Sequence, residues 1–413
     1  MESDSYPRLS GMVRVRFLYL HTFMNRIYTL LLAAICTLSA HAQLNGDGYY
    51  RVQSSEQQRF ITVIDNRGSI NLSTTDADME ALRTRAGFEN VVSNPASIIY
   101  IKKMSSGYDL QSQGTGSYSI ISYEVRVSNM GDDKYWCYAS KSGMTKYLAD
   151  EIITAMTPAQ RRETGKLVTN ISPGTAYEKY LDWNINPIKD EEGFYFGLQP
   201  NVAAGDGYFQ TFYAAFPFTF LSDGMSAWYV SSINEATGKV IIKEVVGGVP
   251  KSTPVIIRCS SQSTASNKLN IGANTSGTAD GNMLKGVYFC NPDAGEKHTN
   301  VVPFDPTTMR VLGTAPDGSL AFVNNVELAY IPANTAYITV SASAPAILKV
   351  TDQEVEPAIP GDLSGDGTVS GQDLVIMTNL ILASAFRADA DLNKDGTISG
   401  ADYVMLVNLI LGK

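Results

Sequence analysis

Short apolar runs that alternate with polar residues occupy most of the first 350 positions and predict a mainly β chain. The runs are rich in Tyr, Phe, Val and Ile, and turns of Gly, Asn and Asp separate them. Strands are predicted at residues 49–52, 60–63, 97–102, 118–127, 135–138 and 194–198. Two helical insertions are also predicted, over residues 75–86, where Asp76 and Asp78 fall in the first turn, and around residues 149–163.

The pattern changes at the C-terminus. Apolar residues in the segments 373–382 and 402–411 recur at helical spacing and predict two matched helices. Pro357, Pro360 and Gly361 stand before the first of these segments, so no full helix precedes it. Residues 351–360 are acidic and bounded by proline, which predicts a semi-stiff linker.

A weak threefold repeat runs through the first β region. The segment from Gly48 reads Gly-Tyr-Tyr-Arg-Val and then Arg-Phe-Ile-Thr-Val, and related segments begin at Ile99 and Tyr138. This repeat resembles that of a β-trefoil, and the closing Trp183 to Pro187 fits the same family. The Gln-x-Trp signature of ricin-type lectins is absent, so no sugar-binding residues are carried over. Residues 43–204 are therefore expected to form a β-trefoil-like domain.

A clearer duplication follows in residues 205–350. The segments 249–257 and 331–339 align at a separation of 82 residues, and in each a proline, Pro250 or Pro332, opens a turn that leads into an apolar strand. The region is expected to form a second, β-sandwich-like domain with an internal duplication.

The N-terminus carries an export signal. Met24-Asn25-Arg26 is followed by a mostly apolar run over 27–38 and then by Ala40-His41-Ala42, the pattern of a Sec signal peptide cleaved before Gln43. Residues 1–42 are therefore interpreted as an over-called start plus a signal peptide. Lipidation of Cys36 is an alternative, but Ile35 stands where a lipobox favours Gly or Ala. Either reading places the protein outside the cell or at its surface.

Composition and charge argue against several classes of function. The 413 residues correspond to two or three folded units, and a formal charge of −9 without a long Lys/Arg run disfavours nucleic acid or an anionic membrane as a partner. After residue 42 no apolar stretch approaches the length of a membrane-spanning helix. His298 is then the only histidine left, which argues against histidine-centred triads and zinc sites.

Three cysteines remain after the signal segment: Cys137, Cys259 and Cys290. Cys259 and Cys290 both end apolar, strand-like runs and are the better candidates for a disulfide. Three buried, reduced thiols are the alternative.

The strongest chemical signal is a loop that occurs twice, at residues 362–373 and 391–402, 29 residues apart. Calcium takes about six to eight oxygen ligands, and a loop of the EF-hand type supplies them from positions 1, 3, 5, 7, 9 and 12, with Gly at position 6 for a sharp turn. Gly367 and Gly396 occupy position 6, and Val369 and Ile398 at position 8 are expected to join the loops by a backbone bridge. The predicted ligands of two calcium ions are Asp362, Ser364, Asp366, the Thr368 carbonyl, Ser370 and Asp373 in the first loop, and Asp391, Asn393, Asp395, the Thr397 carbonyl, Ser399 and Asp402 in the second.

Two calcium loops, each followed but not preceded by a helix, resemble the type I dockerin module. The resemblance covers residues 361–413 and implies two calcium ions and a cohesin-like protein partner. Cellulosomal dockerins carry a hydroxyl pair at positions 10 and 11 that reads the cohesin, whereas this chain has Gly371-Gln372 and Gly400-Ala401. The layout as a whole resembles secreted, β-rich, dockerin-bearing proteins of gut anaerobes.

Three roles for the β regions stay open at this point: catalysis, ligand binding, or service as spacers for the dockerin as the only functional surface. A tethered glycoside hydrolase needs two carboxylates across a cleft, and Asp182, Asp190, Glu191 and Glu192 are candidates beside Trp183. No Gly-x-Ser-x-Gly elbow, P-loop or Rossmann fingerprint accompanies them. The favoured alternative is a non-catalytic protein whose β domains bind glycan or protein, with sugar rings stacking on aromatic side chains. Its candidate residues are Tyr135, Trp136, Trp183, Tyr208 and Trp228.

Overall fold

The computed structural model describes residues 44, 46–63, 82–105, 108–112, 126–132, 134–141, 144–150, 165–168, 173–288, 301–325, 327–352, 359–366 and 368–412. Apart from Leu44, all of these belong to one unit, Gly46–Lys413. Strands dominate this unit and the helices α3 and α4 lie at its C-terminal end, which confirms the mainly β prediction. None of the helices in the described ranges is long and apolar enough to cross a membrane.

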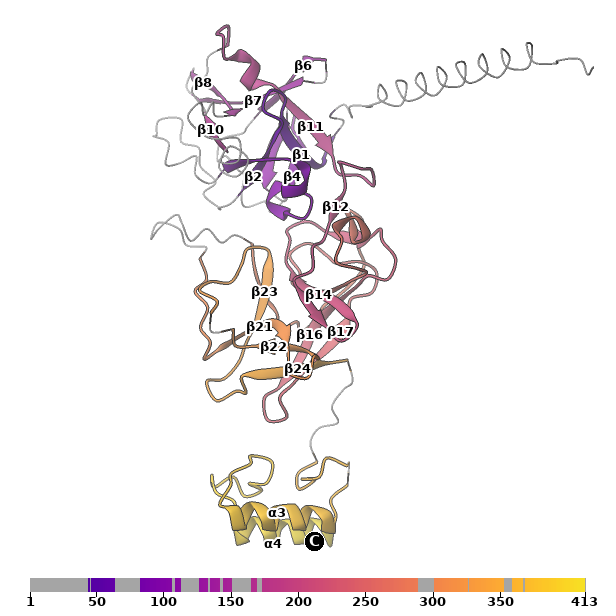
Figure 1. Ribbon diagram of the computed structural model, residues 1–413, viewed down its shortest axis with the longest axis vertical. Helices are drawn as coiled ribbons and strands as arrows, with labels where there is room; N and C mark the ends of the chain where they lie inside the picture. The colour runs from indigo at the N-terminus through magenta and orange to yellow at the C-terminus, as the bar shows by residue number, and fades with distance from the viewer. Residues whose placement is uncertain are drawn as a thin grey trace, which may run out of the picture. The chain divides into compact units, whose positions relative to one another are not determined.

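The first β region is built around β1 (Gly48–Ser54). This strand pairs antiparallel with β2 (Arg59–Val63), β4 (Ile99–Lys103) and β11 (Trp183–Pro187), so chain segments far apart in the sequence meet on it (Figure 1). The other strands of this sheet are β3 (Leu82–Ala86), β5 (Tyr108–Ser112), β6 (Arg126–Gly131), β7 (Lys134–Lys141), β8 (Met144–Tyr147), β9 (Ala149–Asp150) and β10 (Gly165–Val168). The sheet supports the β assignment of this region, and the threefold repeat of a trefoil stays a prediction.

Both helix predictions are wrong for the residues that the structure describes. Residues 82–86 form β3, which pairs along its whole length with β2, and residues 149–150 form β9, which pairs with β10. The pairing supplies backbone hydrogen bonds from distant parts of the chain, and such tertiary contacts override local helix propensity. Residues 75–81 and 151–163 lie outside the described residues. So does most of the predicted strand 118–127, of which only 126–127 are described, within β6.

The second β region contains two sheets. Three short strands, β12 (Phe196–Gly197), β19 (Lys268–Ile271) and β15 (Phe218–Phe220), form one of them. The other runs through β13 (Val202–Ala204), β14 (Gly207–Phe212), β18 (Val255–Cys259), β16 (Ser226–Asn234), β17 (Lys239–Glu244), β24 (Ile347–Thr351), β22 (Leu320–Val323), β21 (Met309–Thr314), β23 (Thr335–Thr339) and β20 (Lys285–Val287). The pair β17 and β24 is parallel, whereas the other pairs of this sheet are antiparallel.

The two duplicated segments of this region share an unusual backbone position. Ser252 and Asn334, 82 residues apart, both adopt left-handed conformations, with φ of 61° and 58°. Positive φ is uncommon for residues other than glycine, so its recurrence at the same place in both turns is informative. Val249 and Ile331, which open the two segments, are both 0% exposed. The sequence duplication thus corresponds to a repeated turn and a repeated buried anchor.

A buried arginine connects β1 to the segment that precedes β12. Arg51 is 1% exposed, and its guanidinium donates to the carbonyl of Tyr195 at 2.9 Å, to those of Val91 and Val92 at 3.3 and 3.2 Å, and to the Ser97 hydroxyl at 3.1 Å. Burial lowers the pKa of Arg51 to about 9. The buried charge is tolerated because several hydrogen-bond acceptors converge on it. Arg51 thereby holds these chain segments together.

Cys137 and Cys259 are free, buried thiols, and burial raises the pKa of each to about 12. For these two residues the reduced alternative therefore holds. Cys290 lies outside the described residues.

Candidate calcium loops

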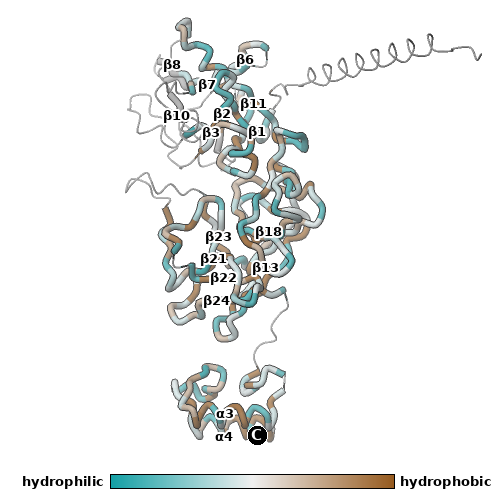
Figure 2. The backbone as a smooth tube through the Cα atoms, viewed as in Figure 1, coloured by the Kyte–Doolittle hydropathy of each residue, from teal (hydrophilic) through white to brown (hydrophobic). Residues whose placement is uncertain are grey.

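The C-terminal residues form two loop-helix halves that pack on a small core of their own. Helices α3 (Gly371–Ala383) and α4 (Gly400–Ile410) follow the two loops, as the sequence predicted. Met377 and Leu406, at equivalent positions 29 residues apart, are both 0% exposed and belong to one apolar cluster with Leu363 and Ala390. Figure 2 shows hydrophobic positions along both helices.

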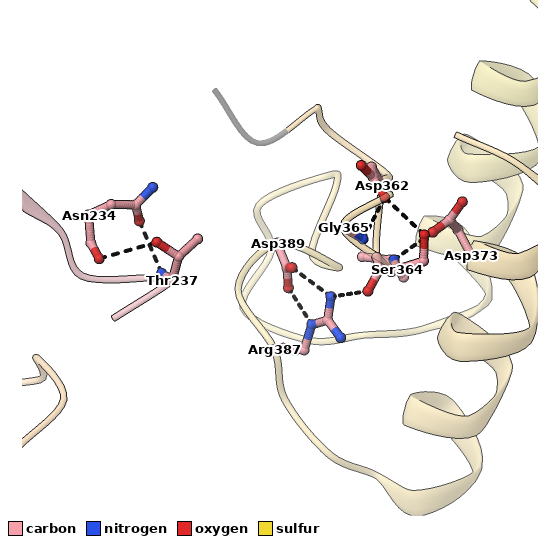
Figure 3. A network of polar contacts seen from close by, with 9 residues as sticks. Asn234, Thr237, Asp362, Ser364, Gly365, Asp373, Arg387 and Asp389 are labelled. Carbon is pink, nitrogen blue, oxygen red and sulfur yellow. Dashed lines mark hydrogen bonds and ion pairs between the residues drawn. The ribbon is translucent and has the colours of Figure 1, made fainter. Parts of the chain in front are cut away.

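The first loop curls around the carboxylate of Asp362. Its Oδ1 atom accepts hydrogen bonds from the backbone N–H of Gly365 at 2.7 Å and of Asp366 at 3.2 Å, and from the Ser364 hydroxyl at 3.2 Å (Figure 3). Asp366 in turn accepts from the N–H and the hydroxyl of Thr368, at 2.9 and 2.7 Å. These bonds hold predicted ligand positions 1, 3 and 5 on one tight turn.

The second loop repeats this arrangement. Asp391 accepts from the N–H of Asp395 at 3.1 Å and of Gly396 at 2.9 Å. Asp395 accepts from the N–H and the hydroxyl of Thr397 at 2.9 and 2.7 Å, the same distances as in the first loop. Gly396 has φ of 84°, the left-handed turn expected at position 6, while Gly367 lies outside the described residues.

Position 12 joins each loop to its helix. Asp373 accepts from the N–H of Ser364 at 2.7 Å and of Ser370 at 2.8 Å, and Asp402 makes equivalent bonds with Asn393 and Ser399. In both halves the serine caps the helix and the aspartate completes a capping box. The same side chain therefore starts the helix and faces the loop.

The burial and charge of the aspartates at position 12 indicate whether each loop can accept a cation. Asp373 and Asp402 are both 0% exposed, and in the described residues neither forms an ion pair. Burial raises the pKa of Asp373, but hydrogen bonds from the N–H groups of Ser370 and Ser364 outweigh this, so its pKa lies below the ordinary value and the carboxylate stays charged at neutral pH. The charge of Arg387 interacts with that of Asp373, although the two residues form no ion pair. A buried anion that no ion pair balances is costly. A divalent ion would balance it, so the donor set fits calcium.

The three predicted aspartate ligands of each loop do not converge on one point in the structure. Across the described residues, no three acidic, histidine or cysteine side chains gather into a metal-ligating group. Ser364, Asn393 and the backbone carbonyls of Thr368 and Thr397 would have to supply the remaining oxygens, as the loop pattern expects.

Two features of this region differ from the sequence analysis or were missed by it. Val369 and Ile398 both pack against the apolar cluster, but the isolated β-bridges among the described residues involve neither, so the expected backbone bridge was wrong and side chains join the loops instead. Arg387 was missed. It donates to the Leu363 carbonyl at 2.8 Å and to both oxygens of Asp389 at 2.7 Å (Figure 3). No local motif marks this residue.

Comparison with known protein families supports the assignment of this region. Residues 360–411 match the type I dockerin domain. The chain therefore carries a type I dockerin domain at its C-terminus, a domain that binds a cohesin domain of a partner protein and generally binds calcium. A search of curated proteins found no match for the chain.

Three of the four candidate carboxylates for catalysis are paired with lysines. Asp182, Asp190 and Glu191 form ion pairs with Lys134 at 3.2 Å and with Lys268 and Lys189 at 2.6 Å. Glu192 is exposed and His298 lies outside the described residues.

The aromatic candidates for sugar stacking are mostly part of the packed interior. Trp183 and Tyr135 are 0% and 2% exposed. Trp136, Tyr208 and Trp228 are half-buried, and the indole N–H groups of Trp136 and Trp228 donate to Asp182 and Ser226. Their side chains thus have structural partners already.

Proposed function

We propose that this protein is secreted or displayed on the cell surface and docks to a cohesin-like domain of another protein through its calcium-loaded dockerin. The observation that carries the proposal is the equivalence of the two halves, in which Asp373 and Asp402 occupy the same buried position and complete the same capping box. The two loops would hold one calcium ion each through the twelve predicted ligands, from Asp362 to Asp373 and from Asp391 to Asp402. When bound, the ions supply the positive charge that lets both acidic loops close.

The docking surface is proposed to lie on the exposed apolar faces of α3 and α4. Val375 and Val404 occupy equivalent positions and are 61% and 57% exposed. Leu382 and Leu411 are also equivalent and are 79% and 59% exposed. Large apolar side chains that are exposed at equivalent positions of both halves are candidates for an interaction site. Because the two sets are equivalent, a partner can engage the dockerin in either of two orientations.

Partner choice would depend on these apolar side chains more than on hydroxyl groups. Positions 10 and 11 of the loops are Gly371-Gln372 and Gly400-Ala401, all exposed, in place of the hydroxyl pair of cellulosomal dockerins. Substitution of Val375 and Val404 together by Ser should therefore abolish docking, whereas Gln372→Ala should weaken it little.

Calcium-dependent capture tests the proposal. The full chain is immobilised and exposed to envelope protein of the parent cell with 2 mM calcium or with EDTA. We expect one protein containing a cohesin-like domain to be retained only with calcium. An Asp362→Ala and Asp391→Ala double variant should lose it, while a matched Asp280→Ala and Asp352→Ala variant, which removes the same charge from exposed positions, should retain it. Retention by the first variant, or retention in EDTA, would contradict the proposal.

A further inference from the structure

A pocket of about 480 Å³ opens beside the start of β1, within the Gly46–Lys413 unit. Its volume falls in the range of small-molecule sites, about 300 to 1,000 Å³. One side of the lining is polar and aromatic, with Asp47, Tyr49, Tyr50 and Tyr100, and the other is apolar and includes Ile188 and Ile271. This pocket uses none of the aromatic residues that the sequence singled out.

The tyrosine rings of the pocket are held in place by packing. The Tyr49 ring lies 4.9 Å from the Tyr100 ring and 5.9 Å from the Phe216 ring, measured between centroids. Gly272, with φ of +79°, approaches so closely that a Cβ atom there would lie 2.8 Å from the Tyr49 ring. Tyr50 is 9% exposed. The aromatic side of the pocket is therefore largely pre-formed.

The hydroxyl group of Tyr49 is available to a ligand. It makes no hydrogen bond with any described residue, and it is not a buried polar atom, since Arg83 Nε is the single buried side-chain nitrogen or oxygen without a partner in the described ranges. Tyr50 is the next residue of β1, so its side chain points to the opposite face of the strand, toward Tyr108 and Tyr135. Burial, followed by the neighbouring Tyr100, raises the pKa of Tyr49 to about 12, so its hydroxyl keeps its proton at neutral pH. The Tyr49 hydroxyl can both donate and accept a hydrogen bond.

The Asp47 carboxylate is oriented at the rim. Its Oδ2 atom accepts from the Tyr100 hydroxyl at 3.1 Å and its Oδ1 atom accepts from the backbone N–H of Lys103 at 2.7 Å. Both oxygens keep acceptor capacity, because a carboxylate oxygen takes more than one hydrogen bond.

We propose that this pocket binds one ring of a neutral saccharide. A sugar ring combines an apolar C–H face, which suits Ile188, Ile271 and the tyrosine rings, with hydroxyl groups that pair with Tyr49 and Asp47. An organic ammonium ion fits less well. It would leave the Tyr49 O–H donor without an acceptor. The site is separate from the dockerin and does not depend on its partner.

Ligand-observed NMR and calorimetry on the full chain test this proposal. The probes are glucose, galactose, mannose, xylose, cellobiose and lactose, with choline as the cationic probe. At least one sugar should bind, and Tyr49→Phe and Asp47→Asn should each weaken its binding by about threefold to tenfold, the loss of roughly one hydrogen bond.

Tyr177→Phe is the matched control, since Tyr177 is 55% exposed and does not line the pocket. It should bind the sugar as the parent does, and circular dichroism should show all variants folded. The proposal is overturned if none of the six sugars shows binding at a concentration of about 20 mM, which detects even weak, millimolar affinity. It is also overturned if choline binds and the sugars do not, or if Tyr49→Phe and Asp47→Asn both bind like the parent.

Discussion

The backbone N–H of Ser364 donates a hydrogen bond of 2.7 Å to Oδ1 of Asp373, which ties position 3 of the first loop to the first turn of α3. Loop closure and helix initiation are therefore one event in each half of the dockerin, because Asp373 and Asp402 also complete the capping boxes. Repulsion among the loop aspartates therefore destabilises the helix as well as the loop.

Removal of calcium should unfold the dockerin and leave the β regions folded. The small apolar cluster around Met377 and Leu406 cannot offset two uncompensated acidic loops. If calcium binds with a dissociation constant of about 10 µM, about 2 mM calcium contributes about 3 kcal/mol to the free energy of unfolding. Differential scanning calorimetry of the full chain should show one transition that moves down in EDTA while the others stay in place. A common shift of all transitions would contradict this expectation.

Arg387 should stabilise the first loop but not the second. Its guanidinium links the segment between the helices to the Leu363 carbonyl through a fork that also holds Asp389. Arg387→Ala should destabilise the dockerin by about 1 to 2 kcal/mol. It should also weaken calcium binding at one of two sites in a calorimetric titration.

Arg387→Lys is the control for charge, because lysine keeps the positive charge but cannot form the planar fork. It should recover only part of the loss. Equal weakening of both calcium sites by Arg387→Ala would show that the residue acts on the whole domain instead.

Replacement of Arg51 should destabilise the β regions. Its guanidinium donates to the carbonyls of Val91, Val92 and Tyr195, and an Arg51→Met variant would lose all of these charge-assisted hydrogen bonds. The Val91 and Val92 carbonyls would keep backbone donors in Asn94 and Gly197. We expect a loss of about 1.5 to 3 kcal/mol in urea unfolding monitored by tryptophan fluorescence. Arg258→Met, which changes a half-exposed arginine paired loosely with Asp206 at 3.8 Å, should cost less than about 1 kcal/mol.

Acid should weaken the second β region in part through Asp317. Hydrogen bonds from Lys349 and then from Ser319 lower the pKa of Asp317 below its ordinary value of 3.8. A carboxylate with a lowered pKa in the folded state stabilises the protein above the ordinary pKa, and this contribution is lost as the pH falls through the folded-state pKa. Denaturant midpoints should therefore fall between pH 5 and about pH 2, and fall less steeply in Asp317→Asn. An unchanged slope in that variant would rule out this contribution.

The sequence by itself determined the dockerin, because its ligands, turn glycine and capping residues all lie within a few positions of one another. Local spacing fixes which atoms meet in such a loop, so Asp362, Asp391 and their neighbours could be predicted before any fold was known. The repeated turns at Ser252 and Asn334 were visible for the same reason.

Only the tertiary structure decided what depends on distant contacts. Residues 82–86 and 149–150 carry no local signal strong enough to prevent a helix prediction, yet they are strands because β2 and β10 lie beside them. Trp183 was a candidate for sugar stacking until packing placed it in the core. The pocket of Asp47, Tyr49 and Tyr100 arises where β1, β4 and later segments come together, and no sequence spacing encodes that meeting.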